Sequence, residues 1–322
     1  MADRLLVPRP GLRIPAAISR RGFLAGAAAA GLLAACGGDD DDTTAGPTST
    51  DAGPGTDGAI VGGLSAVRFF GPYYPAGKPA RVPFGLSDDE GLLSAALAPR
   101  ELGVTVRGPE GEEVASGLTA PLYEGGLPRP YYAFEFEPAA PGFYDIVLDT
   151  GDAGEVITQV QIVDPDDEAV AAMVGPGDRL PALETPTVAD ARGVTPICTR
   201  EPACDLHART AAEVLAAGEP FALLVATPAF CQTVICGPVL DVLLEVLPDV
   251  PGIAAVHAEV FSDPENNPTP PTPEDYAPVI DELGLAFEPV LYTVGADGVV
   301  RERLDYIFGE DEIRRALEDL AA

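Results

Sequence analysis

Basic side chains are scarce in this chain of 322 residues, which contains 19 lysine and arginine residues against 51 aspartate and glutamate residues. Lys78 is the single lysine, and the formal net charge is −32. A surface this acidic repels phosphate groups, so neither nucleic acid nor anionic lipid is expected as a partner.

The apolar run near the N-terminus is too short to cross a membrane. It follows Arg20-Arg21, ends at Ala35 and holds about a dozen apolar residues, whereas a spanning helix needs about 20. A short apolar run behind basic residues is typical of an export signal. Ser19–Leu24 resembles a twin-arginine signal, and Leu33-Ala34-Ala35-Cys36 resembles a bacterial lipobox. The resemblance implies that residues 1–36 are a signal, that Cys36 is lipidated, and that the protein is held at the outer face of the cytoplasmic membrane.

Large apolar side chains are almost missing from residues 37–63, which are mostly Gly, Asp, Thr and Pro. Such a segment cannot offset its own ordering entropy, so we expect a disordered tether. A flexible chain of this length would hold the folded part roughly 30 Å from the lipid.

Cysteine and tryptophan are absent from residues 64–165, where short alternating apolar runs are separated by Gly and Pro turns. This pattern predicts a β-sandwich, and Pro141–Tyr144 resembles the entry to a late strand of immunoglobulin-like domains. The disulfide and tryptophan of antibody domains are missing, and no catalytic set is visible, so a spacer or partner-binding module is expected. The predicted strands are Val67–Phe70, Ala80–Leu86, Gly103–Arg107, Glu113–Gly117, Tyr131–Glu137, Phe143–Asp149 and Val156–Val163.

Histidine and methionine are rare, with two of each in the chain. A thiol-based metal site usually includes such ligands. His257 is flanked by Val256 and Ala258 in a predicted strand, which favours a structural role, and nothing assigns a role to His207. The sequence therefore predicts no metal and no cofactor.

Once Cys36 is set aside, the remaining cysteines form an even set, which in an exported protein indicates two disulfides. Cys198 and Cys204 enclose a short loop containing Pro202, which favours a structural disulfide over a second redox pair. Cys231 and Cys236 follow an apolar strand and precede Gly237-Pro238 and an apolar helix.

A connector is predicted at residues 166–196, followed by a domain at 197–322 with the element order β-α-β-α-β-β-α. That order is the thioredoxin core, and Val174–Pro181 resembles the opening motif of the redoxin branch, so the resemblance covers about residues 174–322. The predicted elements are strands at Phe221–Ala226, Ile253–Phe261, Pro289–Val294 and Val299–Leu304, and helices at Pro238–Leu247, Glu274–Leu283 and Glu310–Leu320.

The resemblance to thioredoxin-like proteins implies that Cys231, which follows Phe230, is the attacking thiol and Cys236 the resolving thiol. It also implies a cis bond before Pro289, which with Phe230 and Thr227 would shape the substrate site. The spacing differs from that of the family, because residues i and i+5 of a helix lie about 8–9 Å apart, too far for a disulfide. We therefore expect residues 231–236 to form a loop and the helix to begin near Pro238. Cys236 would then lie just before a helix N-terminus, which would favour its own thiolate and leaves the choice of attacker open.

Together these features predict a multidomain protein, an immunoglobulin-like sandwich followed by an α/β thioredoxin-like domain. The expected function is membrane-anchored thiol–disulfide exchange with extracytoplasmic protein thiols or disulfides. Two alternatives remain: an atypical peroxiredoxin-like peroxidase, since Thr227–Cys231 resembles a peroxidatic segment, and a non-catalytic surface-binding lipoprotein with structural disulfides.

Overall fold

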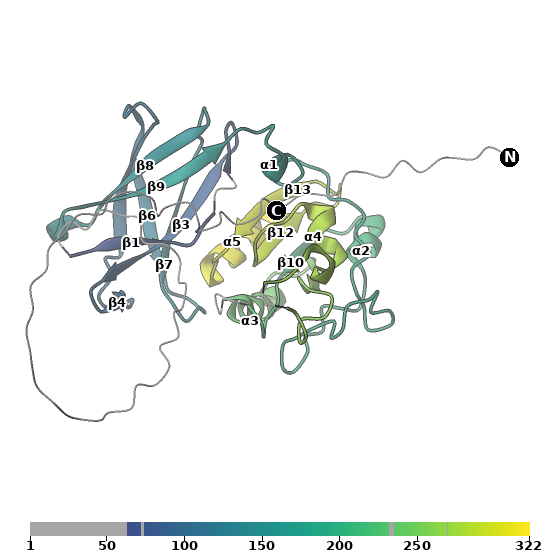
Figure 1. Cartoon of the computed structure of the whole chain (residues 1–322). Helices are drawn as coiled ribbons and strands as arrows, with labels where there is room; N and C mark the ends of the chain where they lie inside the picture. Colours follow the sequence, from purple (N-terminus) through teal and green to yellow (C-terminus); the bar gives the residue numbers. More distant parts are fainter. Residues whose placement is uncertain (1–62, 72–73, 232–234, 269) are drawn as a thin grey trace, which may run out of the picture. The chain divides into compact units, whose positions relative to one another are not determined.

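The computed structural model describes residues 63–71, 74–231, 235–268 and 270–322, which belong to one compact unit (Figure 1). The predicted signal with Cys36, and the predicted tether up to residue 62, lie outside the described residues. Among the helices of the described part, none has the length and apolar character needed to span a bilayer.

The first region is a β-sandwich, in which the described strands follow one hydrogen-bonded path, β1-β3-β7-β6-β5-β8-β9-β2, with β4 paired to β3. The pairs are antiparallel apart from β2 and β9, which run parallel. The strands are β1 (Ser65–Arg68), β2 (Tyr74–Pro75), β3 (Ala80–Asp88), β4 (Gly91–Leu92), β5 (Glu101–Arg107), β6 (Glu113–Tyr123), β7 (Tyr131–Phe136), β8 (Gly142–Asp149) and β9 (Glu155–Val163).

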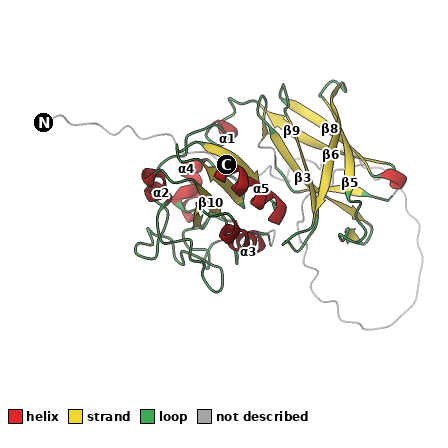
Figure 2. Cartoon of the chain, turned by 180° about the vertical axis from the view of Figure 1, so that it is seen from behind, coloured by secondary structure: helices red, strands yellow, loops and turns green. Residues whose placement is uncertain are grey.

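Alternating side chains explain why these segments form a sandwich. In β5 and β9 every second residue is buried, so each strand presents one apolar face. Buried residues of β3 and β7 pack in one core with buried residues of β5, β8 and β9. Figure 2 shows strands β3, β5, β8 and β9 in this region. All seven predicted strands are present; β6 continues to Tyr123, beyond its predicted end at Gly117, and β1 begins and ends two residues earlier than predicted.

The second region is smaller and consists of a mixed β-sheet with helices packed against it. Its sheet has the order β11-β10-β12-β13, with β10 and β11 parallel and the other pairs antiparallel. The elements are α1 (Glu168–Ala171), α2 (Ala211–Ala217), β10 (Phe221–Val225), α3 (Cys236–Val246), β11 (Ala254–Ala258), α4 (Pro278–Leu283), β12 (Val290–Val294), β13 (Val300–Asp305) and α5 (Glu310–Ala321).

The central strands β10 and β12 are buried throughout because both faces of this sheet are covered. Ala222, Leu224 and Leu291 pack with residues of α3 and α5 on one face. Phe221 and Tyr292, on the opposite face, pack with residues of α2 and α4. The two-residue period of a strand therefore assigns its side chains to two different cores.

Part of the predicted connector belongs to the second region. Leu180, Leu183 and Val194 are buried in the core formed with α2 and α4, and the amide of Leu180 donates to the carbonyl of Gly298 at 2.9 Å. Residues 166–196 are thus not a simple spacer, because apolar residues within this range complete the α/β core.

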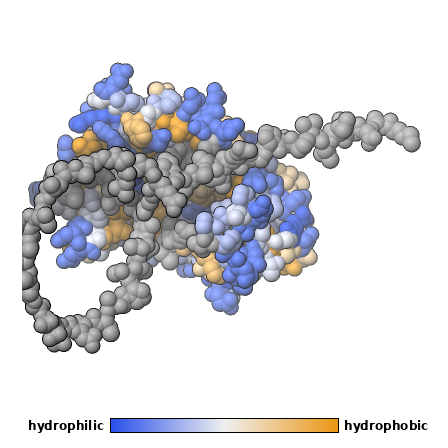
Figure 3. Space-filling view, viewed as in Figure 1, coloured by the Kyte–Doolittle hydropathy of each residue, from blue (hydrophilic) through white to orange (hydrophobic). Residues whose placement is uncertain are grey.

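A buried ion pair joins the sandwich to the α/β region. Arg81 of β3 donates from Nε and Nη2 to the two carboxylate oxygens of Glu312 of α5, at 2.7 and 2.6 Å. The guanidinium also donates to the carbonyls of Asp305 and Ile307, and the Tyr131 hydroxyl donates to Glu312. Elsewhere hydrophilic side chains cover much of the visible described surface, as expected from the excess of acidic residues (Figure 3).

Candidate functional site

Cys231 and Cys236 form a disulfide at the C-terminal end of β10. Their Cα atoms are 5.9 Å apart, within the range of protein disulfides. Cys236 is the first residue of α3 and Cys231 lies outside the helix, so the five-residue separation does not have to be spanned by helical geometry. Residues 232–234, the middle of the predicted loop, lie outside the described residues.

The helix begins two residues earlier than predicted. The amide of Val239 donates to the carbonyl of Ile235 at 2.9 Å, so the first turn closes around Cys236 rather than at Pro238. Pro238 remains in the first helical turn, where its missing N–H would have no partner within the helix in any case.

The two sulfurs differ in accessibility. Cys236 is fully buried, whereas Cys231 is 9% exposed and follows Phe230, whose exposed fraction is 45%. A partner can therefore approach Cys231 more readily than Cys236.

Glu288, which the sequence did not single out, contacts the sulfur of the buried Cys236. Its Oε2 lies 3.4 Å from the Sγ of Cys236 and accepts a hydrogen bond from the amide of Thr227 at 2.7 Å. Burial raises the pKa of Glu288 to about 7, with a further contribution from Glu259. The carboxyl group can thus exchange a proton near neutral pH. Its position directly before the cis-proline was the available signal.

The other predicted site residues lie around this disulfide. The Glu288–Pro289 peptide bond is cis, as predicted, and Pro289 is buried at the start of β12. Thr227 is also fully buried, and its hydroxyl accepts from the amide of Val260 at 3.1 Å. Thr227 therefore holds the carboxyl group of Glu288 in place from a buried position. Of the predicted substrate-site residues, Phe230 is the one with a large exposed surface.

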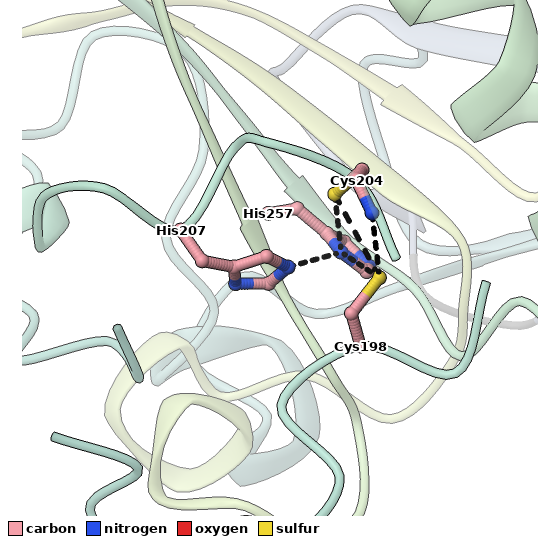
Figure 4. A group of neighbouring side chains, drawn as sticks. All are labelled: Cys198, Cys204, His207 and His257. Atoms are coloured by element: carbon pink, nitrogen blue, oxygen red, sulfur yellow. Dashed lines mark hydrogen bonds between the residues drawn. The ribbon is translucent and has the colours of Figure 1, made fainter. Parts of the chain in front are cut away.

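The predicted disulfide between Cys198 and Cys204 is not formed, and both residues are free thiols. Their sulfurs are 3.7 Å apart, well beyond a bond of about 2.05 Å. Both side chains turn toward His257 of β11 and His207, which follows Cys204 on the same loop (Figure 4). The sequence predicted no metal ligands, yet the structure gathers the chain's two histidines around two of its cysteines.

The cluster of Cys198, Cys204, His207 and His257, the Cys2His2 cluster below, is buried and electrostatically coupled. The pKa of Cys198 is lowered by hydrogen bonding with Cys204 and the imidazoles, whereas the hydrogen bond with Cys198, burial and the charge on Cys198 raise the pKa of Cys204. Burial opposes charge on His257, but its contact with Cys198 and the nearby Glu259 raise its pKa.

The sequence contained a partial indication of this cluster, because three of its four members lie close together in the chain. Cys198, Cys204 and His207 lie within ten residues of chain, and the fourth member comes from a strand 50 residues further on. The pairing of β10 with β11 places His257 opposite Leu224, and the amide of His257 donates to the carbonyl of Leu206 in the loop at 3.2 Å.

Thr199 connects the cluster to the disulfide. Its hydroxyl accepts a hydrogen bond from the amide of Ala229, two residues before Cys231, at 3.1 Å. Its own amide donates to Glu259 at 2.6 Å. The loop that carries Cys198 therefore also supports the segment that leads to Cys231.

Comparison with known proteins assigns no family to this chain. No family model matches it, and no curated protein matches it. Among solved structures, the Lin-41 filamin domain is similar at 13% identity and a TM-score of 0.22, over 33% of this chain and 98% of that chain. The superoxide reductase neelaredoxin from Ignicoccus hospitalis is similar at 16% identity and a TM-score of 0.19, over 29% of this chain and 76% of that one.

Proposed function

We propose that this protein is a thiol–disulfide oxidoreductase of the thioredoxin-like type, exported and anchored to the outer face of the cytoplasmic membrane through a lipid on Cys36. The proposal rests on one observation: a disulfide between the fully buried Cys236 and the slightly exposed Cys231, with Cys236 in contact with a carboxyl group whose pKa is raised to about 7.

The α/β region supports the thioredoxin-like part of the proposal. From β10 to α5 the principal elements follow in the order β-α-β-α-β-β-α, and the sheet order is β11-β10-β12-β13. The disulfide lies at the first strand–helix junction of this arrangement, and Pro289 lies immediately before β12. The sandwich would be an immunoglobulin-like module that carries no part of the reaction.

The accessibility of the two sulfurs assigns their roles. Cys231 would be the attacking thiol, because it is the more accessible one and lies beside the exposed Phe230. Cys236 would be the resolving thiol. Glu288, whose carboxyl group lies in contact with Cys236, would accept its proton at the moment of attack.

The exchange would proceed in two balanced steps. In the reduced protein the Cys231 thiolate attacks a disulfide of the partner, forms a mixed disulfide and releases one partner thiolate. Cys236 then gives its proton to Glu288 and attacks the Cys231 sulfur. The Cys231–Cys236 bond forms, the second partner thiolate leaves, and the partner has gained two electrons. Run in reverse, the same steps oxidise a partner dithiol.

The test is a pair of cysteine variants in the full chain. With Cys236→Ser, mixed disulfides between Cys231 and extracytoplasmic proteins should accumulate in cells and disappear in the Cys231→Ser/Cys236→Ser double variant. Recovery of no mixed disulfide with Cys236→Ser would refute the exchange function.

Glu288→Gln tests the proton transfer in the purified protein with a disulfide-bonded peptide as substrate. Removing a general base typically costs about 10²-fold or more, so the second step should slow by that factor and lose its inflection near pH 7. Glu265→Gln, at an exposed glutamate, is the matched control and should leave the rate and the pH profile unchanged.

The peroxidase alternative has a distinct outcome in the same assay. Consumption of peroxide with formation of the Cys231–Cys236 bond would favour it. A peroxidatic cysteine needs an activating arginine, and the two arginines of β13 have other partners: Arg301 is bonded to Asp297 and Arg303 to Asp305. The structure offers the peroxidase no further support.

The membrane anchor is tested separately. Cys36→Ser should abolish incorporation of a labelled fatty acid and shift the protein from the detergent phase to the aqueous phase. An unchanged distribution would remove the lipid anchor from the proposal without affecting the exchange reaction.

A further inference from the structure

We propose that the Cys2His2 cluster binds one zinc ion as a closed, four-coordinate structural site. The four potential ligand atoms all lie within 4.8 Å of one another. Cys198, Cys204 and His207 come from the loop before α2, and His257 comes from β11, so the ligands join a loop to the central sheet.

The distances within the cluster match the edges of a zinc tetrahedron. With Zn–S bonds of about 2.3 Å and Zn–N bonds of about 2.0–2.1 Å, a tetrahedral site has S···S, S···N and N···N edges of about 3.8, 3.6 and 3.3 Å. The sulfurs of Cys198 and Cys204 are 3.7 Å apart. The Nδ1 atom of His257 lies 3.8 and 3.6 Å from these two sulfurs. The remaining measured edge, from His257 Nδ1 to His207 Nε2, is 3.2 Å.

The orientation of His257 is that of a metal ligand. Its Nε2 lies 3.0 Å from the carbonyl oxygen of Ala226, to which it donates when it carries the proton. This contact leaves Nδ1 bare and directed into the cluster. A hydrogen bond from the second ring nitrogen to a backbone carbonyl is the usual outer support of a metal-bound histidine.

The site is built into the interior rather than left on the surface. His257 and His207 are 0 and 1% exposed, and Cys198 and Cys204 are 7 and 8% exposed. Four protein ligands in a tetrahedron leave no position for water or substrate, which is the arrangement of structural rather than catalytic zinc.

Charge and ligand type favour zinc over other metals. Two thiolates and two neutral imidazoles neutralise a divalent ion, so the loaded site carries no net charge in its buried setting. A monovalent copper ion would leave one negative charge beside the buried Glu259. Tetrahedral sites with two sulfur and two nitrogen ligands are typical of zinc.

The test begins with the metal content of the full chain, purified in detergent with a thiol reductant and then dialysed after exposure to zinc. The expected result is about one zinc per chain by elemental mass spectrometry. X-ray absorption of the same sample should give two sulfur ligands at about 2.3 Å and two nitrogen ligands at about 2.0–2.1 Å.

Ligand variants identify the site. His257→Ala should lower zinc affinity by more than the 10–100-fold that outer-shell partners are typically worth, and Cys204→Ser should do the same. The matched control is the Cys231→Ser/Cys236→Ser double variant, which removes the other thiol pair and should keep the full zinc content. Because a ligand variant can fail to fold, cobalt is titrated into the metal-free wild-type protein. Tetrahedral visible bands and a thiolate-to-cobalt charge-transfer band are expected.

The proposal is overturned by a reduced wild-type protein that takes up no zinc, by a zinc content that survives His257→Ala and Cys204→Ser, or by an X-ray absorption spectrum without two sulfur ligands. A Cys198–Cys204 disulfide that persists after reduction and zinc exposure would also refute it. None of these measurements depends on Cys231 or on exchange activity, so this proposal and the proposed function can fail independently.

Discussion

Replacing Arg81 with methionine should destabilise the protein strongly, because it leaves a buried carboxylate without its counter-ion. In the native protein Arg81 makes two charged hydrogen bonds to Glu312 and one to each of the carbonyls of Asp305 and Ile307. Methionine retains much of the aliphatic packing and removes all four bonds. Tyr131 remains as a donor to Glu312.

The magnitude follows from the burial of the pair. Breaking a buried ion pair by removing one partner typically costs about 3–5 kcal/mol. For a chain of this size, each kcal/mol corresponds to about 2–4 °C in Tm, so Arg81→Met should melt about 6–20 °C lower. The free energy of unfolding is measured by urea unfolding and Tm by thermal unfolding, both at pH 7 with circular dichroism and with the Cys231–Cys236 disulfide kept intact.

Two variants make this prediction specific. Arg100→Met breaks an ion pair with Glu124 in the same β-region, but these side chains are 72 and 47% exposed, so the loss should stay below about 1 kcal/mol. The Arg81→Met/Glu312→Met double variant removes both charges and should be more stable than Arg81→Met alone. The reasoning is refuted if Arg81→Met costs no more than Arg100→Met, or if the double variant loses the sum of the single effects.

The remaining predictions concern single side chains. Burial raises the pKa of Glu288 from 4.5 to about 7, so the folded protein binds this proton more tightly than the unfolded chain. The stability that this proton contributes is present at low pH and is lost as pH rises from 4.5 through 7. The unfolding free energy of the wild type, measured relative to that of Glu288→Gln, should therefore fall by up to about 3 kcal/mol between pH 4.5 and 8. Thr210→Ala removes the side-chain cap of α2, whose hydroxyl accepts from the amide of Glu213 at 2.9 Å, and should cost about 1 kcal/mol in urea unfolding; no loss would contradict the cap. Gly284→Ala should cost at least the roughly 1–2 kcal/mol of a left-handed residue, because φ is +63° and the added Cβ would clash with the carbonyl oxygen of Ala172. A Tm equal to that of the wild type would show that this turn can relax.

Local periodicity was enough to predict most strands and the order of the elements. The alternation of apolar and polar residues in β5 and β9 predicted the sandwich, and the uninterrupted apolar run of β10 indicated a strand covered on both faces. Helix α2 was missed because it has only seven residues, and its capping pair, Thr210 and Glu213, was the only strong signal. The start of α3 was placed too late because Pro238 was taken to mark the first turn rather than to lie within it.

The candidate site was predicted less completely than the fold, because its chemistry depends on contacts between distant segments. Cys231, Cys236 and Pro289 were found from spacing and order. Glu288 reaches Cys236 across 52 residues of chain, and its raised pKa comes from burial that no local pattern indicates. His257 likewise had the neighbours of an ordinary strand residue, and its partners became visible only when β11 paired with β10.

The core beneath α3 and α5 also includes Tyr131 and Ala133, two residues of sandwich strand β7. The hydroxyl of Tyr131 accepts from the amide of Gly309 at 2.7 Å, immediately before α5. A gene fragment that encoded only the α/β region would thus lack part of its own interior. We expect the two regions to be inherited as a pair, and recombination that separates them to be selected against.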